Sequence, residues 1–352
     1  MIKEGIQKLI ESRDLTMDEA SKIMEEIMVG EAKSSQIASF LTALRIKGET
    51  TDEITALVEV MRKHSVKINP KVSGKLVDTC GTGGDKIKTF NISTCAAFVI
   101  AGAGIPVAKH GNRSVTSTCG SADLLEDFGM KLDSNPEVTE AAIEKVGIGF
   151  LFAPTFHPAM KHVATVRRDL GIRTVFNIIG PLSSPALVNN QVLGVFDSSK
   201  IESLAIVLKN LGSEEVMVVS GLDGVDEIST FGKTKIAHLK HGKIRVYESV
   251  PSDFGVKEVD VSEIVGSTRE KNVEMAFKIL RGSSQDRARV DAVLVNAAAG
   301  IVVGGGSDKF EDALEIARTS LTNGSSYQKL KELIHFQGKY TSRLEELERK
   351  FG

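Results

Sequence analysis

The sequence predicts an α/β protein with a small, all-helical domain at its N-terminus. The first 65 residues show helical periodicity alone. From Leu76 onward, short apolar runs alternate with helical segments, as in a sheet covered by helices. Between the two parts, Ile68-Asn69-Pro70-Lys71 interrupts the helical pattern, because proline disfavours helix in the residue before it and lacks a backbone N–H. We therefore expect a linker there.

The composition limits the size of the protein and the kinds of partner it can bind. The chain has 352 residues, of which 41% are hydrophobic and 26% charged, so it can form a sizeable core and two domains. Its 44 basic and 46 acidic residues leave a formal net charge of −2. The net charge of the chain therefore provides no electrostatic attraction that would favour binding to nucleic acid or to an anionic membrane. An anionic ligand has to be bound by a local site.

The cysteines and the N-terminal segment indicate the compartment. Cys80, Cys95 and Cys119 are odd in number and lack the spacing of a zinc site, which argues against a disulfide framework. No apolar signal segment follows Met1, and no run approaches the roughly 18 apolar residues of a membrane span. These features predict a soluble, cytoplasmic protein.

Four amphipathic helices are expected in the first 65 residues. Thr16 and Glu19 have the spacing of a capping box, and so do Thr50 and Glu53, while a glycine is placed to end the third helix. The apolar stripes predict a bundle whose methionine-rich faces pack in a core or against another subunit. The stripe residues are Ile2, Ile6, Leu9, Ile10, Met17, Ala20, Ile23, Met24, Ile27, Met28, Ile37, Phe40, Leu41, Leu44, Ile54, Leu57, Val58 and Met61.

The second part of the chain predicts alternating strands and helices. A strand at residues 76–77 leads to a glycine-rich loop and then to a helix that Ser93 or Thr94 can cap. Gly180-Pro181 is expected to end a helical segment, and residues 235–247 predict a hairpin. Further strands are expected at 105–108, 148–153, 191–196 and 216–220, and helices at 122–128, 136–146, 157–170, 201–211, 272–280, 285–301, 308–321 and 325–334.

The glycine-rich loop Gly81-Thr82-Gly83-Gly84-Asp85 is a candidate phosphate site. Glycine lets backbone approach a ligand closely, and amides at a loop and helix start carry partial positive charge. The loop lacks the Gly-Lys-Ser/Thr of a Walker motif and the spacing of a dinucleotide fingerprint. Alone, such a loop is more often a tight turn. Asn91, Ser93 and Thr94 favour the binding interpretation, since they supply groups suited to sugar and phosphate oxygens.

A second polar loop, Lys109-His110-Gly111-Asn112-Arg113, places two cations, an imidazole and an amide around one glycine. An ordinary surface loop would explain the cations. Because the run follows an apolar strand, we expect it to face a cleft at the carboxyl end of the sheet. There Lys109 would contact phosphate, and His110 or Asn112 would lie near an acceptor substrate. Gly120-Ser121-Ala122-Asp123 offers another helix start.

Two further clusters are candidates with ordinary alternatives. Asp226-Glu227 follows an apolar strand and supplies the oxygen ligands that Mg²⁺ prefers, although an acidic turn would look the same. Arg167, Arg168 and His157 could form a solvated helix face. One of these arginines could instead hold a substrate carboxylate through two hydrogen bonds.

Taken in order, these motifs resemble the signature of the anthranilate phosphoribosyltransferase family. The resemblance covers nearly the whole chain. It continues through His157-Pro158-Ala159-Met160, Arg167, the run at residues 171–177, Gly180-Pro181 and Asp226-Glu227-Ile228-Ser229.

The resemblance implies a reaction and a fold. The family transfers the 5-phosphoribosyl group from 5-phosphoribosyl 1-pyrophosphate (PRPP) to the amine of anthranilate, releasing pyrophosphate, in tryptophan biosynthesis. Its fold implies a small helical domain at residues 1–68, with a return segment near 165–184. A larger α/β donor-binding domain at 71–164 and 185–352 would contain a central mixed, mostly parallel sheet flanked by helices. Mg²⁺ and a homodimer formed through the helical domain are also implied.

The resemblance assigns roles to individual residues. Ser93, Asp226 and Glu227 would hold Mg²⁺. His110 is the one candidate base, although an aromatic amine needs no strong base. The implied donor residues are Gly81, Thr82, Gly83, Gly84, Asp85, Thr89, Asn91, Ser93, Thr94, Lys109, His110, Gly111, Asn112 and Ser121. The implied anthranilate residues are Gly81, His110, Asn112, His157, Arg167, Gly180 and Pro181.

Two departures and two rival functions stay open. Thr118 and Cys119 stand where the family pattern leads us to expect a basic residue and a serine, and Asp223 could join the metal site. A nucleoside phosphorylase of related architecture is the nearest rival, although it would not need the Asp226-Glu227 pair. A non-catalytic nucleotide-binding or assembly protein is the rival of another class.

Overall fold

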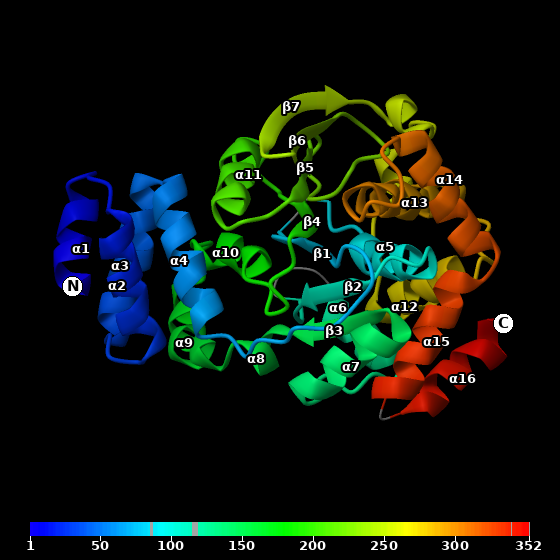
Figure 1. Cartoon of the computed structure of the whole chain (residues 1–352), viewed down its shortest axis with the longest axis horizontal. Helices are drawn as coiled ribbons and strands as arrows, with labels where there is room; N and C mark the ends of the chain where they lie inside the picture. Colours follow the sequence, from blue (N-terminus) through cyan, green and yellow to red (C-terminus); the bar gives the residue numbers. More distant parts are fainter. Residues whose placement is uncertain (85–86, 115–118, 339, 352) are drawn as a thin grey trace.

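The computed structural model describes residues 1–84, 87–114, 119–338 and 340–351. A helical bundle at the N-terminal end is joined to a larger part in which helices cover a seven-stranded sheet (Figure 1). The mixed, mostly parallel sheet and the separate bundle confirm the predicted fold class. No helix of the described chain is long and apolar enough to cross a membrane.

The bundle consists of α1 (Ile2–Ile10), α2 (Met17–Met28), α3 (Ser34–Lys47) and α4 (Thr51–Lys63). Both predicted capping boxes are confirmed, since the side chains of Thr16 and Thr50 accept hydrogen bonds from the backbone N–H groups of Glu19 and Glu53. Glu53 is fully buried and pairs with Lys47 at 2.8 Å. Except for Ile10 and Met17, which are exposed, the residues of the predicted apolar stripes meet inside the bundle and form its core.

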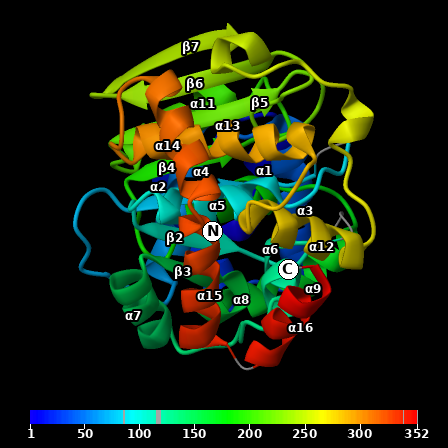
Figure 2. The same cartoon turned by 90° about the vertical axis from the view of Figure 1, so that its right-hand side faces the viewer.

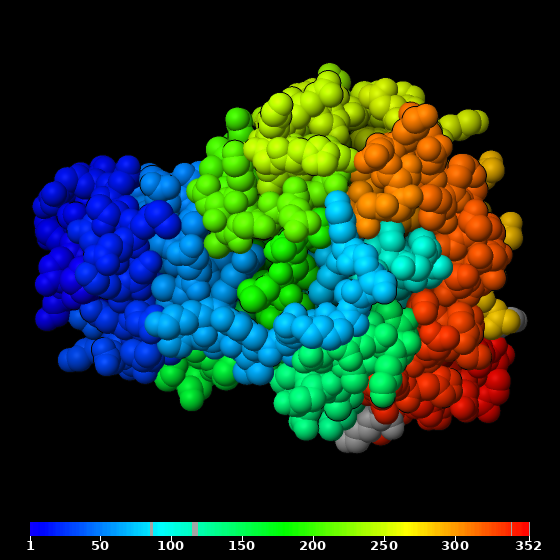
Figure 3. Space-filling view, in the orientation of Figure 1, coloured from blue at the N-terminus to red at the C-terminus, as the bar shows by residue number. Residues whose placement is uncertain are grey.

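A later segment of the chain returns to this bundle. Helix α9 (Lys161–Leu170) packs on α3 and α2, and α10 (Phe176–Leu182) packs on α4. Their apolar residues join the bundle core, which continues through α11 (Ile201–Asn210) onto one face of the sheet. On this packing we propose the domain division that the sequence predicts. The space-filling view shows the linker after α4, in pale blue, crossing the surface from the bundle to the α/β part (Figure 3).

The sheet has the strand order β3-β2-β1-β4-β5-β6-β7. Strands β1 to β5 are parallel, and β6 and β7 form the predicted hairpin, which adds two antiparallel strands at one edge. The strands are β1 (Val77–Gly81), β2 (Val107–Gly111), β3 (Ile148–Phe152), β4 (Asn190–Gly194), β5 (Glu215–Gly221), β6 (Thr234–Lys240) and β7 (Lys243–Ser249).

Helices of the C-terminal half cover the face of the sheet that lies away from the bundle (Figure 2). Helices α5 (Ile92–Gly102) and α13 (Arg287–Val303) pack against each other, and both contact β1. The remaining helices are α5 (Ile92–Gly102), α6 (Ser121–Asp127), α7 (Pro136–Val146), α8 (Ala153–Phe156), η1 (Pro158–Met160), η2 (Pro251–Phe254), η3 (Val261–Glu263), α12 (Arg269–Leu280), α13 (Arg287–Val303), α14 (Phe310–Thr322), α15 (Ser325–Gln337) and α16 (Thr341–Phe351).

Three local predictions are wrong. Helix α5 starts after Asn91, so Ser93 and Thr94 lie inside its first turn instead of capping it. Pro181 lies within the last turn of α10, which continues to Leu182, so Gly180-Pro181 does not end the helix. The helix expected at 157–170 is divided among η1 and α9, with α8 before them, because Pro154 and Pro158 each start a new turn.

Helix α16 was not predicted. Leu344 is buried, and Leu347 and Phe351 pack against the large core, at helical spacing. The many charged residues between them hide this stripe, so the sequence indicated α15 as the last helix.

Candidate functional site

The carboxyl ends of the central strands open into a cleft of about 610 Å³ between the α/β layers and the returning helices. This is where parallel α/β sheets usually bind ligands. The glycine-rich loop after β1, the second polar loop after β2, the segment from α8 to α10 and the turn after β5 all line it.

The structure brings the sequence-predicted site residues into this one cleft. Asp85 and Thr118 lie outside the described residues, so only their neighbours are placed. Cys119 lines the cleft with a buried thiol whose pKa burial raises. The predicted residues that line the cleft are Gly81, Thr82, Gly83, Gly84, Thr89, Asn91, Ser93, Thr94, Lys109, His110, Gly111, Asn112, Ser121, His157, Arg167, Gly180, Pro181, Asp226 and Glu227.

The glycine-rich loop and the acidic turn after β5 are in direct contact. The backbone N–H of Gly83 donates to Asp226 Oδ2 at 2.8 Å. A Cβ added at Gly194, at the end of β4, would lie 1.7 Å from the backbone oxygen of Asp226. Only glycine therefore allows the acidic turn to approach the sheet this closely.

Asp223 does not line the cleft in the described part of the chain. Its carboxylate accepts a hydrogen bond from Ser229 Oγ at 2.5 Å and closes its own turn. Burial raises the pKa of Asp223. The sequence left open whether Asp223 joins the metal site. Its contacts instead give this side chain a structural role in its own turn.

Lys109 is a buried cation at the floor of the cleft. Its Nζ donates to the backbone oxygen of Thr79 at 2.6 Å and lies 3.4 Å from Ser93 Oγ. The side chain is only 3% exposed, so its charge is weakly screened from a ligand in the cleft. The next residue, His110, donates its backbone N–H to the buried carboxylate of Asp78 at 3.1 Å. Burial raises the pKa of Asp78 to about 7, against the opposing effect of Lys109.

His110 and His157 form a pair of uncharged imidazoles. Their ring centroids are 5.2 Å apart, and both side chains are buried. Burial, with His157 and Lys109 adding to it, holds the pKa of His110 well below its usual range, and burial lowers the pKa of His157 to about 4. Within the described residues, Nε2 of His157 lacks a hydrogen-bond partner, and the backbone carbonyl of Gly180 acts to raise the pKa of His110 against the other effects. A neutral imidazole offers one donor and one acceptor, so the pair can bind a polar, uncharged group.

Arg167 and Arg168 have different environments, although the sequence treats them as one cluster. Arg167 lines the cleft with its guanidinium 5.6 Å from the Phe176 ring, whereas Arg168 is exposed and points elsewhere. Burial lowers the pKa of Arg167. No carboxylate of the described residues pairs with Arg167. A half-buried guanidinium of this kind is suited to a ligand carboxylate.

Several cleft residues were missed at the sequence level. The Arg173 guanidinium stacks 3.9 Å above the Phe196 ring and donates to the backbone oxygen of Gly84. Arg173 lies in the run that resembles the family, but no local pattern gave it a role. Phe196 and Met61 carry no motif at all, because each comes from the end of an element that only the fold brings to the cleft.

The oxygen ligands of the cleft fit Mg²⁺. Asp226, Glu227 and Ser93 line the same region and supply only hard oxygen donors. The described residues contain no group of three His, Cys, Asp or Glu side chains that could hold a metal alone. One or two carboxylates suit a Mg²⁺ ion that keeps waters and shares substrate phosphates.

A helical bundle joined to an α/β layer, with an anion loop, a buried lysine and an acidic pair in one cleft, defines a class of glycosyl transferases. The helical bundle domain of the glycosyl transferase family matches residues 3–65, and its a/b domain matches residues 73–327.

Three relatives narrow the class. An anthranilate phosphoribosyltransferase of Pelotomaculum thermopropionicum is 49% identical over 96% of this chain and 97% of its own. The crystal structure of the Thermus thermophilus enzyme of that name has a TM-score of 0.89 and 38% identity, covering 95% of this chain and 99% of its own. The Saccharomyces cerevisiae enzyme, in complex with PRPP and Mg, has a TM-score of 0.87 and 28% identity, covering 95% and 97%. The chain belongs to the anthranilate phosphoribosyltransferase family.

Proposed function

We propose that this protein transfers the 5-phosphoribosyl group of PRPP to the amine of anthranilate, releasing pyrophosphate, in L-tryptophan biosynthesis. The observation that carries the proposal is the composition of the cleft. One side has the glycine loop, Lys109 and an oxygen-only acidic pair, and the other has two neutral histidines and Arg167. The relative crystallised with PRPP and Mg supports the donor side of this assignment.

The donor would lie over the glycine-rich loop. Backbone N–H groups of the loop and of the first turn of α5 would bind phosphate oxygens, since both carry partial positive charge. Lys109, reaching between Thr79 and Ser93, would face the pyrophosphate and stabilise the negative charge that develops on it. Asn91, Thr94 and Ser121 of the same wall would bind the sugar and phosphate oxygens. Asp85 lies outside the described residues, and we propose that it also binds PRPP, as the sequence predicts.

The acceptor would occupy the side formed by α8 to α10. Arg167 would bind the carboxylate of anthranilate, and the neutral imidazoles of His110 and His157 would accept or donate hydrogen bonds at its amine and ring edge. Gly180 and Pro181 would form the wall against the ring. Asn112 would lie between the two substrates, because its loop borders both sides.

Mg²⁺ would be held by Asp226, Glu227 and Ser93 together with the donor, where it would neutralise the leaving pyrophosphate. Catalysis by the chain itself would be mainly positioning: the amine is already a nucleophile, and the cleft aligns it with C1′ of the donor. His110 is the candidate that receives the amine proton. Its low pKa makes it a weak base, which agrees with a reaction that needs little base strength.

The test is an anthranilate fluorescence assay with the purified protein. We expect fluorescence to fall only when PRPP and Mg²⁺ are both present, and pyrophosphate to appear in equal amount. Phosphate with a nucleoside should give no base release, which separates this function from a phosphorylase. Absence of turnover with all three components present would overturn the proposal.

We further propose that the protein works in the cytoplasm as a homodimer formed through its bundle. Cys80 and Cys95 are free thiols in the described part of the chain, as in proteins of reducing compartments. The bundle carries large exposed apolar residues, among them Ile46 at 82% and Ile10 at 66% exposure, which support a subunit contact there.

A further inference from the structure

Asn296 is a polar residue in the buried middle of α13. The side chain is 2% exposed, and its helix neighbours Val295 and Ala297 are fully buried apolar residues. A buried amide is costly unless it is hydrogen-bonded, so its contacts indicate its role.

Both ends of the Asn296 amide bind the backbone of one residue. Its Oδ1 accepts the backbone N–H of Ile228 at 2.9 Å, and its Nδ2 donates to the backbone oxygen of Ile228 at 3.1 Å. The second Nδ2 hydrogen is used by the helix itself, through the backbone oxygen of Ala292 at 2.9 Å. Asn296 therefore fixes the position and orientation of Ile228, the residue directly after Glu227.

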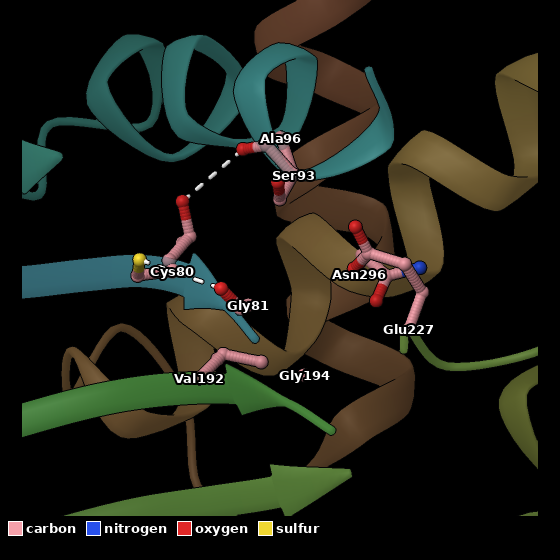
Figure 4. Close-up of a pocket in the computed structure, with 9 residues that line it drawn as sticks. Cys80, Gly81, Ser93, Ala96, Val192, Gly194, Glu227 and Asn296 are labelled. Carbon is pink, nitrogen blue, oxygen red and sulfur yellow. Dashed lines mark hydrogen bonds between the residues drawn. The ribbon is translucent and has the colours of Figure 1, made fainter. Parts of the chain in front are cut away.

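The acidic turn is held on its other side by the glycine-rich loop. Gly83 donates to the Asp226 carboxylate, and Gly194 allows the close approach of the Asp226 backbone. Glu227 lies between these two fixed points. Figure 4 shows Asn296 on α13 beside Glu227, and both line a small space of about 10 Å³ together with Ser93. That space has room for about one water molecule, so the residues that line it lie close together.

We infer that Asn296 is a positioning residue for the Mg²⁺-binding turn: its two-point contact with Ile228 orients Asp226 and Glu227 toward the ion that accompanies PRPP. This inference rests on the proposed function. Groups that orient metal ligands from behind commonly change metal affinity by about 10- to 100-fold when they are removed.

The test compares Asn296→Leu with the wild type and with Gln337→Leu. Leucine removes both contacts to Ile228 at similar volume. Gln337 is a matched control because it is a buried amide on another helix, α15, and bonds Thr139 on α7 at 3.0 Å, away from the acidic turn. Mn²⁺ binding in the presence of PRPP is measured by electron paramagnetic resonance, and the Mg²⁺ requirement of turnover is measured in parallel.

We expect Asn296→Leu to raise the half-saturating Mn²⁺ and Mg²⁺ concentrations by about 10-fold or more and to leave the KM for anthranilate within about twofold. Gln337→Leu should leave the metal requirement within about twofold even if it lowers Tm. If Asn296→Leu does not fold, Asn296→Ser replaces it, since serine is too short to span both groups of Ile228.

An unchanged metal requirement in a folded Asn296 variant would overturn the inference, and so would an equal rise in Gln337→Leu. In both cases the proposed function is still supported if the wild type binds Mn²⁺ with PRPP and turns over anthranilate. A wild type that binds no Mn²⁺ with PRPP would instead overturn the proposed function, and the inference with it.

Discussion

Arg167 and Arg168 are adjacent in sequence, yet only one of them reaches the cleft. Arg167 is half-buried over Phe176 without a carboxylate partner among the described residues, whereas Arg168 is exposed. A bound carboxylate would supply the missing partner through charge-assisted hydrogen bonds. Substituting each arginine in turn therefore compares a cleft residue with an exposed residue of the same helix.

Arg167→Ala should raise the KM for anthranilate by about 10- to 100-fold, since a hydrogen bond to a charged group contributes about 1.5–3 kcal/mol. The KM for PRPP should change far less, because the lost contact is to the acceptor. Steady-state kinetics with each substrate varied in turn measures both. Arg168→Ala is the control and should change neither by more than about twofold. Equal effects on the two KM values would contradict the assignment of Arg167 to the acceptor.

His157 links the acceptor side to the pH dependence of stability. Burial lowers its pKa to about 4, so the folded protein keeps the imidazole neutral while the unfolded chain takes up a proton below about 6.5. Between these two values the unfolded state binds more protons, and stability must fall as pH falls. His110 acts in the same direction, whereas Asp78, whose pKa is raised to about 7, acts in the opposite one.

A variant isolates the contribution of His157 from these overlapping groups. His157→Gln removes the titration, so the free energy of unfolding of the wild type, minus that of the variant, should rise by about 2 kcal/mol from pH 5 to pH 7. Urea unfolding at several pH values measures this difference. A difference that stays flat over that range would show that His157 titrates in the folded protein as it does in the unfolded chain.

At the scale of elements, the site depends on contacts between loops, strands and helices that are distant in sequence. The sequence predicted the two polar loops and the acidic pair because glycine, hydroxyl and charged residues follow apolar runs there. It could not predict Phe196, Met61 or Asn296, since each belongs to an ordinary strand end or helix. Only the packing of β4, α4 and α13 brings them to the loops. The start of α5 at Asn91 was missed for a related reason, because the Asn91 side chain binds the backbone oxygen of Cys119, which is distant in sequence.

Gly194 shows the same dependence on backbone contact. A Cβ at this position would lie 1.7 Å from the Asp226 oxygen, and no change of rotamer relieves a clash with backbone. Gly194→Ala should therefore displace the acidic turn and lower kcat by at least about 10-fold with a raised Mg²⁺ requirement. Mg²⁺ titrations of turnover measure both.

Gly212 provides the comparison for that substitution. An added Cβ there meets no atom within 4 Å, although the positive φ of 86° strains any side chain. Gly212→Ala should cost about 1 kcal/mol of stability and leave the Mg²⁺ requirement unchanged. A Gly194→Ala enzyme with normal Mg²⁺ dependence would mean that the turn can move without loss of its function.

At the scale of the whole molecule, the bundle and the α/β part share one apolar core yet bound the cleft from opposite sides. Helices α9 and α10 pack on the bundle and carry Arg167, Gly180 and Pro181, whereas the proposed donor residues lie in the α/β part. Arg62 on α4 reinforces this junction, since its Nε and Nη2 donate to the backbone oxygen of Leu182 at 3.0 and 2.7 Å. The acceptor side of the cleft is therefore attached to the bundle.

The outer face of the bundle makes the association of two copies testable. Ile10, at the end of α1, and Ile46, near the end of α3, are exposed, and paired burial of such residues would stabilise a dimer. We expect sedimentation velocity to show a dimer for the wild type and a monomer for the double variant Ile10→Glu and Ile46→Glu, because a buried unpaired carboxylate is strongly unfavourable. Val261→Glu, at a residue 40% exposed in η3 of the α/β part, is the control and should remain dimeric.

Since the acceptor side of the cleft is carried by the bundle, a folded monomer should lose affinity for anthranilate before it loses affinity for PRPP. A double variant that stays dimeric would place the subunit contact on another surface.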